Sequence, residues 1–137
     1  DLSVSTKLKN STLNYIFVYG TLMKQESRNG LMEQYSAEFL GQKSINGKLL
    51  DLSSFPGMVH DFNLVIKGEL YYCQEIENCL EKLDWIEGFH GYDTEDSMFT
   101  RIITKVNDEN SPKWAWTYLY NGESDNIINS GSWRDRD

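Results

Sequence analysis

The chain has 137 residues, 39% of them hydrophobic, which is enough to bury one proper core and indicates one domain. Its net charge of −8 and its lack of a Lys/Arg cluster argue against a nucleic-acid partner, because no face could bind phosphates. An anionic substrate would approach against this charge, so local amides or an arginine must hold it. No apolar run approaches membrane-spanning length and no signal-peptide pattern appears, so we expect a cytoplasmic protein with no membrane partner.

The predicted elements form a strand-rich α+β domain over residues 15–137, preceded by a polar, flexible N-terminal tail over residues 1–14. No internal repeat or linker divides the domain. Helices are predicted at 30–35 and 74–88. Strands are predicted at 15–19, within 39–52 with interruptions at Gly41 and Gly47, at 57–60, 64–73, 99–106 and 114–120, the last two as a hairpin that turns at 108–112.

The first strand, 15–19, is wholly apolar and aromatic, and it stops abruptly at Gly20, Thr21 and Leu22. A glycine at a strand end permits close approach of the backbone, and consecutive turn amides can form a concave nest for an anion. The hydroxyl of Thr21 adds a group that could hold a carboxylate or carbonyl oxygen. The alternative is an ordinary turn from strand to loop.

Glu87 is a charged residue at a position where the helix pattern requires an apolar one. Ile76, Leu80 and Leu83 form one stripe of the predicted helix, and the next position on that stripe is Glu87, followed by Gly88 as a helix-ending residue. Burial and the helix C-terminus would both raise the pKa of this carboxyl and make it a better proton acceptor near neutral pH. The alternative is that Glu87 turns outward into solvent in a frayed last turn.

Two features of the final hairpin allow either a structural or a ligand-binding interpretation. Arg101 on the first of its strands could form a buried ion pair or contact a substrate carboxylate. Aromatic residues alternate along the second strand and therefore share one face, which we interpret as a core face or barrel wall in preference to a ligand site; they are Trp114, Trp116, Tyr118 and Tyr120.

Cysteine and histidine are too few to indicate a metal site. Cys73 and Cys79 are the only cysteines, and we favour two buried free thiols in a reducing compartment over a disulfide. With His60 and His90 as the only histidines, neither metal-ligand spacing nor a Cys–His nucleophile pair is present. We therefore expect no metal.

Several short motifs, in this order and spacing, resemble those of the gamma-glutamylcyclotransferase-like family, especially its gamma-glutamylamine cyclotransferase branch. The resemblance runs from about Tyr15 to near the C-terminus. The motifs are Tyr19-Gly20-Thr21-Leu22, Phe55-Pro56-Gly57, Gly68-Glu69-Leu70-Tyr71, Leu83-Asp84-Trp85-Ile86-Glu87-Gly88, Phe99-Thr100-Arg101 and Ala115-Trp116-Thr117-Tyr118.

The resemblance implies a small mixed β-barrel with flanking helices and an enzyme that needs no cofactor. In this family the α-amine of a small-molecule gamma-glutamyl substrate attacks its own γ-carbonyl, which forms 5-oxoproline and releases an amine or amino acid. The family's catalytic carboxylate corresponds to Glu87, its substrate-binding turn to Tyr19, Gly20, Thr21 and Leu22, and its pocket aromatic hydroxyl to Tyr118. The alternative is a non-catalytic binding module for a small ligand on the same fold. A free amino acid, a polyamine, a lysine side chain and an antibiotic amine would all be compatible leaving groups.

Overall fold

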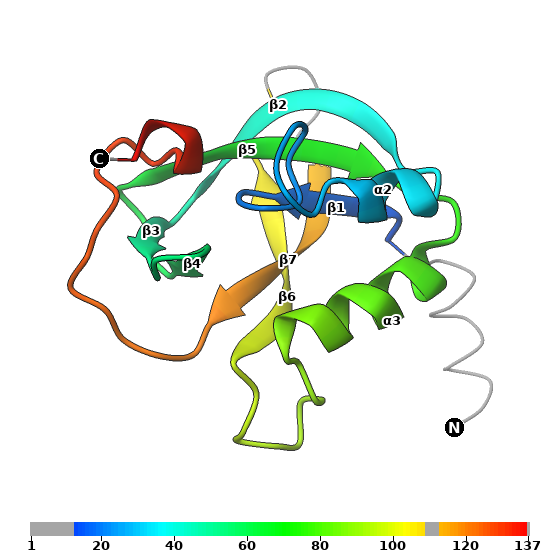
Figure 1. The fold of residues 1–137 in the computed structure, drawn as a ribbon. Helices are drawn as coiled ribbons and strands as arrows, with labels where there is room; N and C mark the ends of the chain where they lie inside the picture. Colours follow the sequence, from blue (N-terminus) through cyan, green and yellow to red (C-terminus); the bar gives the residue numbers. More distant parts are fainter. Residues whose placement is uncertain (1–12, 109–112, 137) are drawn as a thin grey trace.

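The computed structural model describes residues 13–108 and 113–136, which form a curled sheet, a small two-stranded sheet and two α-helices (Figure 1). Each element that the sequence predicts is present, and its ends lie within about two residues of the predicted ones. The elements are β1 (Tyr15–Val18), α2 (Gly30–Gln34), β2 (Glu38–Asn46), β3 (Lys48–Asp51), β4 (Pro56–Val59), β5 (Val65–Tyr72), α3 (Ile76–Glu87), β6 (Phe99–Val106), β7 (Lys113–Tyr120) and a 3-10 turn (Trp133–Asp135).

The main sheet has the strand order β2-β5-β1-β7-β6, with β1 in the centre. β1 pairs antiparallel with β5 and parallel with β7, so the sheet is mixed. Its two edge strands approach each other, because the N–H of Asn107 just after β6 donates to the carbonyl of Ser44 in β2 at 2.9 Å. The sheet therefore curls toward closure, which confirms the predicted α+β class and its barrel-like sheet.

Of the two glycines predicted to interrupt the strand region 39–52, only one does so. Gly47 separates β2 from β3, and a Cβ there would lie 2.9 Å from Cδ1 of Ile66. The prediction for Gly41 was wrong, because β2 continues through it as a bulge with a φ of 117° and a shift of pairing register after Phe39. A bulge keeps the strand paired while it increases the local bend, which suits a curling sheet.

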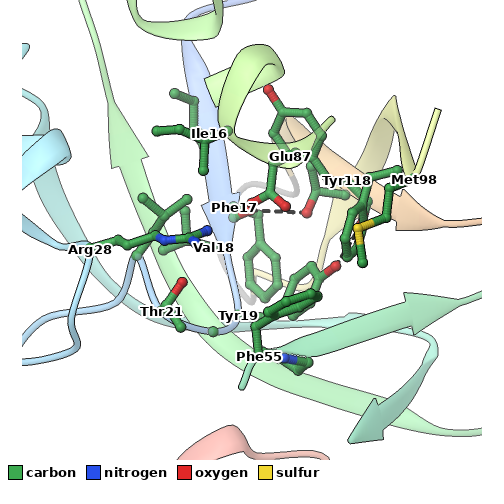
Figure 2. A pocket seen from close by; sticks show the side chains of 16 residues that line it. Ile16, Phe17, Val18, Tyr19, Thr21, Arg28, Phe55, Glu87, Met98 and Tyr118 are labelled. Atoms are coloured by element: carbon green, nitrogen blue, oxygen red, sulfur yellow. Dashed lines mark hydrogen bonds between the residues drawn. The ribbon is translucent and has the colours of Figure 1, made fainter. Parts of the chain in front are cut away.

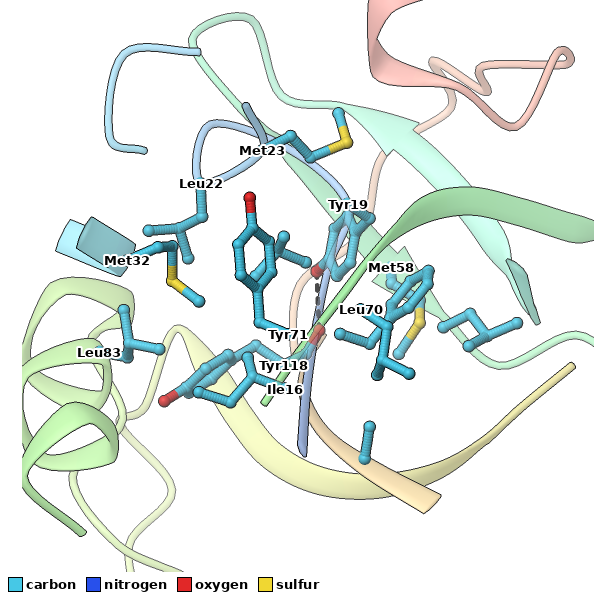
Figure 3. Close-up of a cluster of buried hydrophobic side chains, with 14 of the residues drawn as sticks. Ile16, Tyr19, Leu22, Met23, Met32, Met58, Leu70, Tyr71, Leu83 and Tyr118 are labelled. Carbon is cyan, nitrogen blue, oxygen red and sulfur yellow. Dashed lines mark hydrogen bonds between the residues drawn. The ribbon is translucent and has the colours of Figure 1, made fainter. Parts of the chain in front are cut away.

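Helix α3 follows the predicted stripe. Ile76, Leu80 and Leu83 are buried, and Leu83 belongs to the same buried cluster as Met32 of α2 (Figure 3). Gly88 ends the helix in the left-handed conformation, with a φ of 67°. This sharp ending fixes the direction of the last turn, the one that carries Glu87.

The aromatic residues of β7 differ in burial, but three of the four belong to the core or pack against it, in line with the predicted core face or barrel wall. Tyr118 is buried, whereas the side chain of Trp114 is 53% exposed. The fully buried positions on the opposite face are the small Ala115 and Thr117.

Of the predicted N-terminal tail, residues 1–12 lie outside the described residues, as do residues 109–112 of the predicted hairpin turn. Leu13 and Asn14 are bonded to the domain: the carbonyl of Leu13 accepts a hydrogen bond from Nε1 of Trp116, and Nδ2 of Asn14 donates to the carbonyl of Cys73, both at 2.9 Å. No helix in the described ranges is long and apolar enough to cross a membrane.

Candidate active site

The turn after β1 leaves two consecutive backbone N–H donors free of hydrogen bonds to described residues, as an anion-binding nest requires. The carbonyl of Gly20 accepts from the N–H of Met23 at 3.0 Å, and the carbonyl of Thr21 accepts from the N–H of Arg28 at 2.8 Å. In contrast, the N–H groups of Thr21 and Leu22 have no hydrogen-bond partner among the described residues. Both residues line a pocket, so these two donors are available to a ligand oxygen there.

Buried polar contacts hold this turn from behind. Nδ2 of Asn29 donates to the carbonyl of Leu22 at 2.8 Å. The carboxylate of Glu69, only 2% exposed in the middle of β5, accepts from the N–H of Lys24 at 2.8 Å and pairs with Arg134 at 3.2 Å. A buried carboxylate requires such partners, so the turn is fixed in place before any ligand arrives.

The last turn of α3 meets this nest in one pocket, which Figure 2 shows from close by. The pocket brings together every site residue that the sequence predicts, although Glu87 lies more than sixty positions after the turn. The structure places Glu87, half-buried, among the residues that line this pocket. The pocket is lined by Ile16, Phe17, Val18, Tyr19, Gly20, Thr21, Leu22, Arg28, Phe55, Pro56, Ile86, Glu87, Met98, Phe99, Thr117 and Tyr118.

The environment of Glu87 favours the protonated carboxyl at mildly acidic pH. Burial raises its pKa from 4.5 to about 7, and the guanidinium of Arg28 opposes this rise. No hydrogen bond or ion pair to another described side chain stabilises the carboxylate. A carboxyl whose pKa lies close to neutral pH can both accept and return a proton.

Tyr118 contributes its ring to the pocket, while its hydroxyl donates to Oδ1 of Asp84 at 2.6 Å. The other oxygen of Asp84 pairs with Nη1 of Arg101 at 3.1 Å, and the guanidinium of Arg101 lies 4.6 Å from the centre of the Trp116 ring. Arg101 is thus engaged in a structural ion pair, and it does not line the pocket. This network ties the end of α3 to the β6–β7 hairpin.

Sequence reasoning missed Arg28, the cation of this pocket. It lies in an irregular loop between β1 and α2, where no periodicity indicates which way a side chain points. The described residues contain no group of three or more His, Cys, Asp or Glu side chains placed to hold a metal ion.

The family model described as gamma-glutamyl cyclotransferase, AIG2-like, matches residues 16–135. The chain belongs to this family of enzymes. Among curated relatives, the gamma-L-glutamyl-butirosin B gamma-glutamyl cyclotransferase of Niallia circulans is 34% identical over 108 residues, covering 77% of this chain and 66% of that one. The gamma-glutamylcyclotransferase family protein YtfP of Escherichia coli K12 is 32% identical over 126 residues, covering 89% of this chain and 97% of that one. The chain thus spans slightly less than two thirds of the Niallia protein and nearly all of YtfP.

Solved structures agree with the fold. YkqA of Bacillus subtilis matches with a TM-score of 0.70 and 26% identity, over 89% of this chain and 40% of that one. An AIG2-like protein of Mus musculus matches with a TM-score of 0.65 and 22% identity, over 82% of this chain and 80% of that one. The predicted family resemblance is confirmed.

Proposed function

We propose that this chain cyclises a gamma-glutamyl group to 5-oxoproline and releases an amine or amino acid, with Glu87 as general acid and base. The observation that carries the proposal is that Glu87, with a pKa of about 7, shares one pocket with the unoccupied amides of Thr21 and Leu22. The names of the curated relatives support the reaction class.

The reaction moves two protons from the α-nitrogen to the leaving nitrogen, because an ammonium becomes the N–H of a lactam. The α-ammonium of the substrate first gives a proton to the Glu87 carboxylate, and the free amine attacks the γ-carbonyl carbon. A new C–N bond then closes the five-membered lactam. The protonated Glu87 gives this proton to the leaving nitrogen as the original amide bond breaks. The ring nitrogen still carries one proton too many for a lactam, and the Glu87 carboxylate passes it to the released amine, which leaves as an ammonium. The carboxylate is thereby regenerated and neither water nor an external acid is consumed.

The pocket supports this step by holding the reacting atoms together. The N–H groups of Thr21 and Leu22 can donate to an oxygen of the gamma-glutamyl group, and the hydroxyl of Thr21 adds a third donor. Buried apolar side chains such as Phe17 and Phe99 line the pocket and limit the access of water to the carboxylate. Fixed donors and a confined amine favour the near-attack geometry that an intramolecular aminolysis needs.

The test measures release of 5-oxoproline from a panel of gamma-glutamyl compounds, without added cofactor or metal. The panel contains gamma-glutamyl amino acids, a gamma-glutamyl polyamine, ε-(gamma-glutamyl)lysine and a simple gamma-glutamylamine, which differ only in the leaving group. Glu87→Gln keeps the size of the side chain but cannot take the proton. We expect kcat to fall about 100- to 10,000-fold, with little change in KM.

Glu81→Gln is the matched control, because Glu81 lies on the same helix but is exposed and outside the pocket. It should retain the wild-type rate. Equal turnover by Glu87→Gln would remove Glu87 from the mechanism. Binding without turnover by the wild-type protein, across the whole panel, would instead favour the non-catalytic binding module.

A further inference from the structure

Arg28 differs from the other arginines of the chain in having no salt bridge and no side-chain hydrogen bond to a described residue. Arg101 pairs with Asp84, and Arg134 pairs with Glu26 and Glu69. Arg136 donates to the carbonyl of Trp133 and stacks on its ring at 3.6 Å. The cation of Arg28 is therefore available to a ligand.

The backbone of Arg28 is fixed beside the nest, although its side chain is free. Its N–H donates to the carbonyl of Thr21 at 2.8 Å, and the next residue, Asn29, is bonded to Leu22. Figure 2 shows the guanidinium of Arg28 extending past Thr21 into the pocket, toward the carboxyl group of Glu87. The two charges influence each other without forming an ion pair, so the pocket keeps space between them.

We propose that Arg28 binds the α-carboxylate of the gamma-glutamyl group and thereby makes the site selective for substrates in which that carboxylate is free. The identity of the ligand rests on the function proposed above. Arg28 has this role because it lines the same pocket as Glu87, faces it without pairing with it, and has no other described partner.

The chemistry of the ligand matches this arrangement of charges. The α-ammonium and α-carboxylate of a gamma-glutamyl group share one carbon atom, so the site needs an anion and a cation that face each other across a small gap. Glu87 is the anion and Arg28 is the cation. On a chain with a net charge of −8, a carboxylate needs such a local cation, and the planar guanidinium can donate to both of its oxygens.

Binding of the α-carboxylate would also act on the base. Arg28 lowers the pKa of Glu87. A carboxylate bound to Arg28 neutralises that influence, and this offsets part of the opposite effect of the substrate's own α-ammonium, which lowers the pKa of Glu87. Recognition at Arg28 thus helps Glu87 to stay basic enough to accept the ammonium proton.

The test compares two ligands that differ only at the α-carboxylate: gamma-L-glutamyl-n-butylamine and its α-carboxamide. Their dissociation constants are measured by calorimetry or NMR titration on Glu87→Gln protein, so the assay needs no turnover. We expect the acid to bind roughly 10- to 100-fold more tightly than the carboxamide, as a charge-assisted hydrogen-bonded pair predicts. Adding Arg28→Gln should remove this preference, and Arg28→Lys should keep part of it.

Lys105→Gln is the charge-matched control, because Lys105 is exposed on β6 and outside the pocket. It should keep the full preference, which separates a contact from a change in overall charge. Retained preference in the Arg28→Gln protein, equal binding of both ligands when Arg28 is present, or no binding of either would overturn the proposal. Failure of the wild-type protein to turn over the acid, with the preference for it intact, would count against the proposed reaction and still support the role of Arg28.

Discussion

At the scale of single residues, the site depends on one carboxyl placed where an apolar side chain would stabilise the helix better. Glu87 continues the stripe of Leu80 and Leu83, and Gly88 ends the helix directly after it. The carboxyl therefore points into a pocket with apolar walls, and burial raises its pKa to about 7. This cost in stability is typical of functional sites, where local preferences are sacrificed for chemistry.

We predict that kcat/KM falls on the acidic side of neutrality with an apparent pKa near 7, because Glu87 acts as a base only when ionised. Arg28 lowers this pKa, so Arg28→Gln should move the acidic limb to higher pH. Initial rates at low substrate concentration between pH 5 and 9 in constant-ionic-strength buffers, roughly spanning the expected pKa, measure both effects. An acidic limb at the same pH in both proteins would contradict the prediction.

The pH dependence of protein stability tests the raised pKa of Glu87 independently of the kinetics. The folded-state pKa of Glu87 lies above its usual value of 4.5, so folding favours the protonated form. The associated stability is complete below the unfolded pKa and is lost as pH rises through the folded one. The melting temperature of Glu87→Gln should therefore increase relative to that of the wild-type protein as pH rises from below 4.5 to above 7.

At the scale of the elements, the spacing of apolar residues along the sequence predicted most of the helices and strands. The helices, β5 and the β6–β7 hairpin were predictable because their apolar spacing or apolar runs reflect burial. Gly41 was not, because a bulge and an interruption both require a glycine-like backbone and differ only in tertiary pairing. The helix stripe indicated Glu87 as a proton acceptor and the turn after β1 as an anion site, and the family resemblance joined the two into one proposed reaction. Arg28 escaped prediction because a loop has no period from which to infer the direction of a side chain.

The turn after β1 depends on glycine for space at Gly20. A Cβ at this position would lie 2.6 Å from Cγ of Pro56, much closer than real Cβ contacts. We predict that Gly20→Ala displaces the turn and lowers kcat/KM by about 100-fold, because small misplacements of a binding group strongly reduce intramolecular catalysis. Steady-state kinetics and melting temperatures of the purified variant measure the effect.

Gly30→Ala is the matched control for this substitution. A Cβ at Gly30, the first residue of α2, would meet no atom within 4 Å. This variant should keep wild-type kinetics. A normal rate for Gly20→Ala as well would mean that Pro56 moves aside and that the position of the turn does not limit catalysis.

At the scale of the whole molecule, the site exists only when the sheet is complete. The parallel pair of β1 and β7 joins Ile16 to Trp116, and the contact of Ser44 with Asn107 brings the sheet edges together. These pairings link segments far apart in the sequence, and the pocket forms where the ends of β1 and α3 meet the hairpin. The pocket therefore forms only when the whole fold is in place, and a local sequence pattern cannot predict such an arrangement.

The same closure buries both thiols, and this gives a global test of the fold and of the expected reducing compartment. Cys73 and Cys79 are unpaired and fully buried, and burial raises the pKa of Cys79 to about 12. We predict that a thiol reagent at pH 8 reacts slowly with the native protein and counts both cysteines after unfolding without a reductant. The thiolate is the reactive form, so burial and the raised pKa protect each sulfur until β5 and α3 separate from the core. A count of zero, with a mass lower by a pair of hydrogens, would reveal a disulfide and contradict the prediction of a reducing compartment.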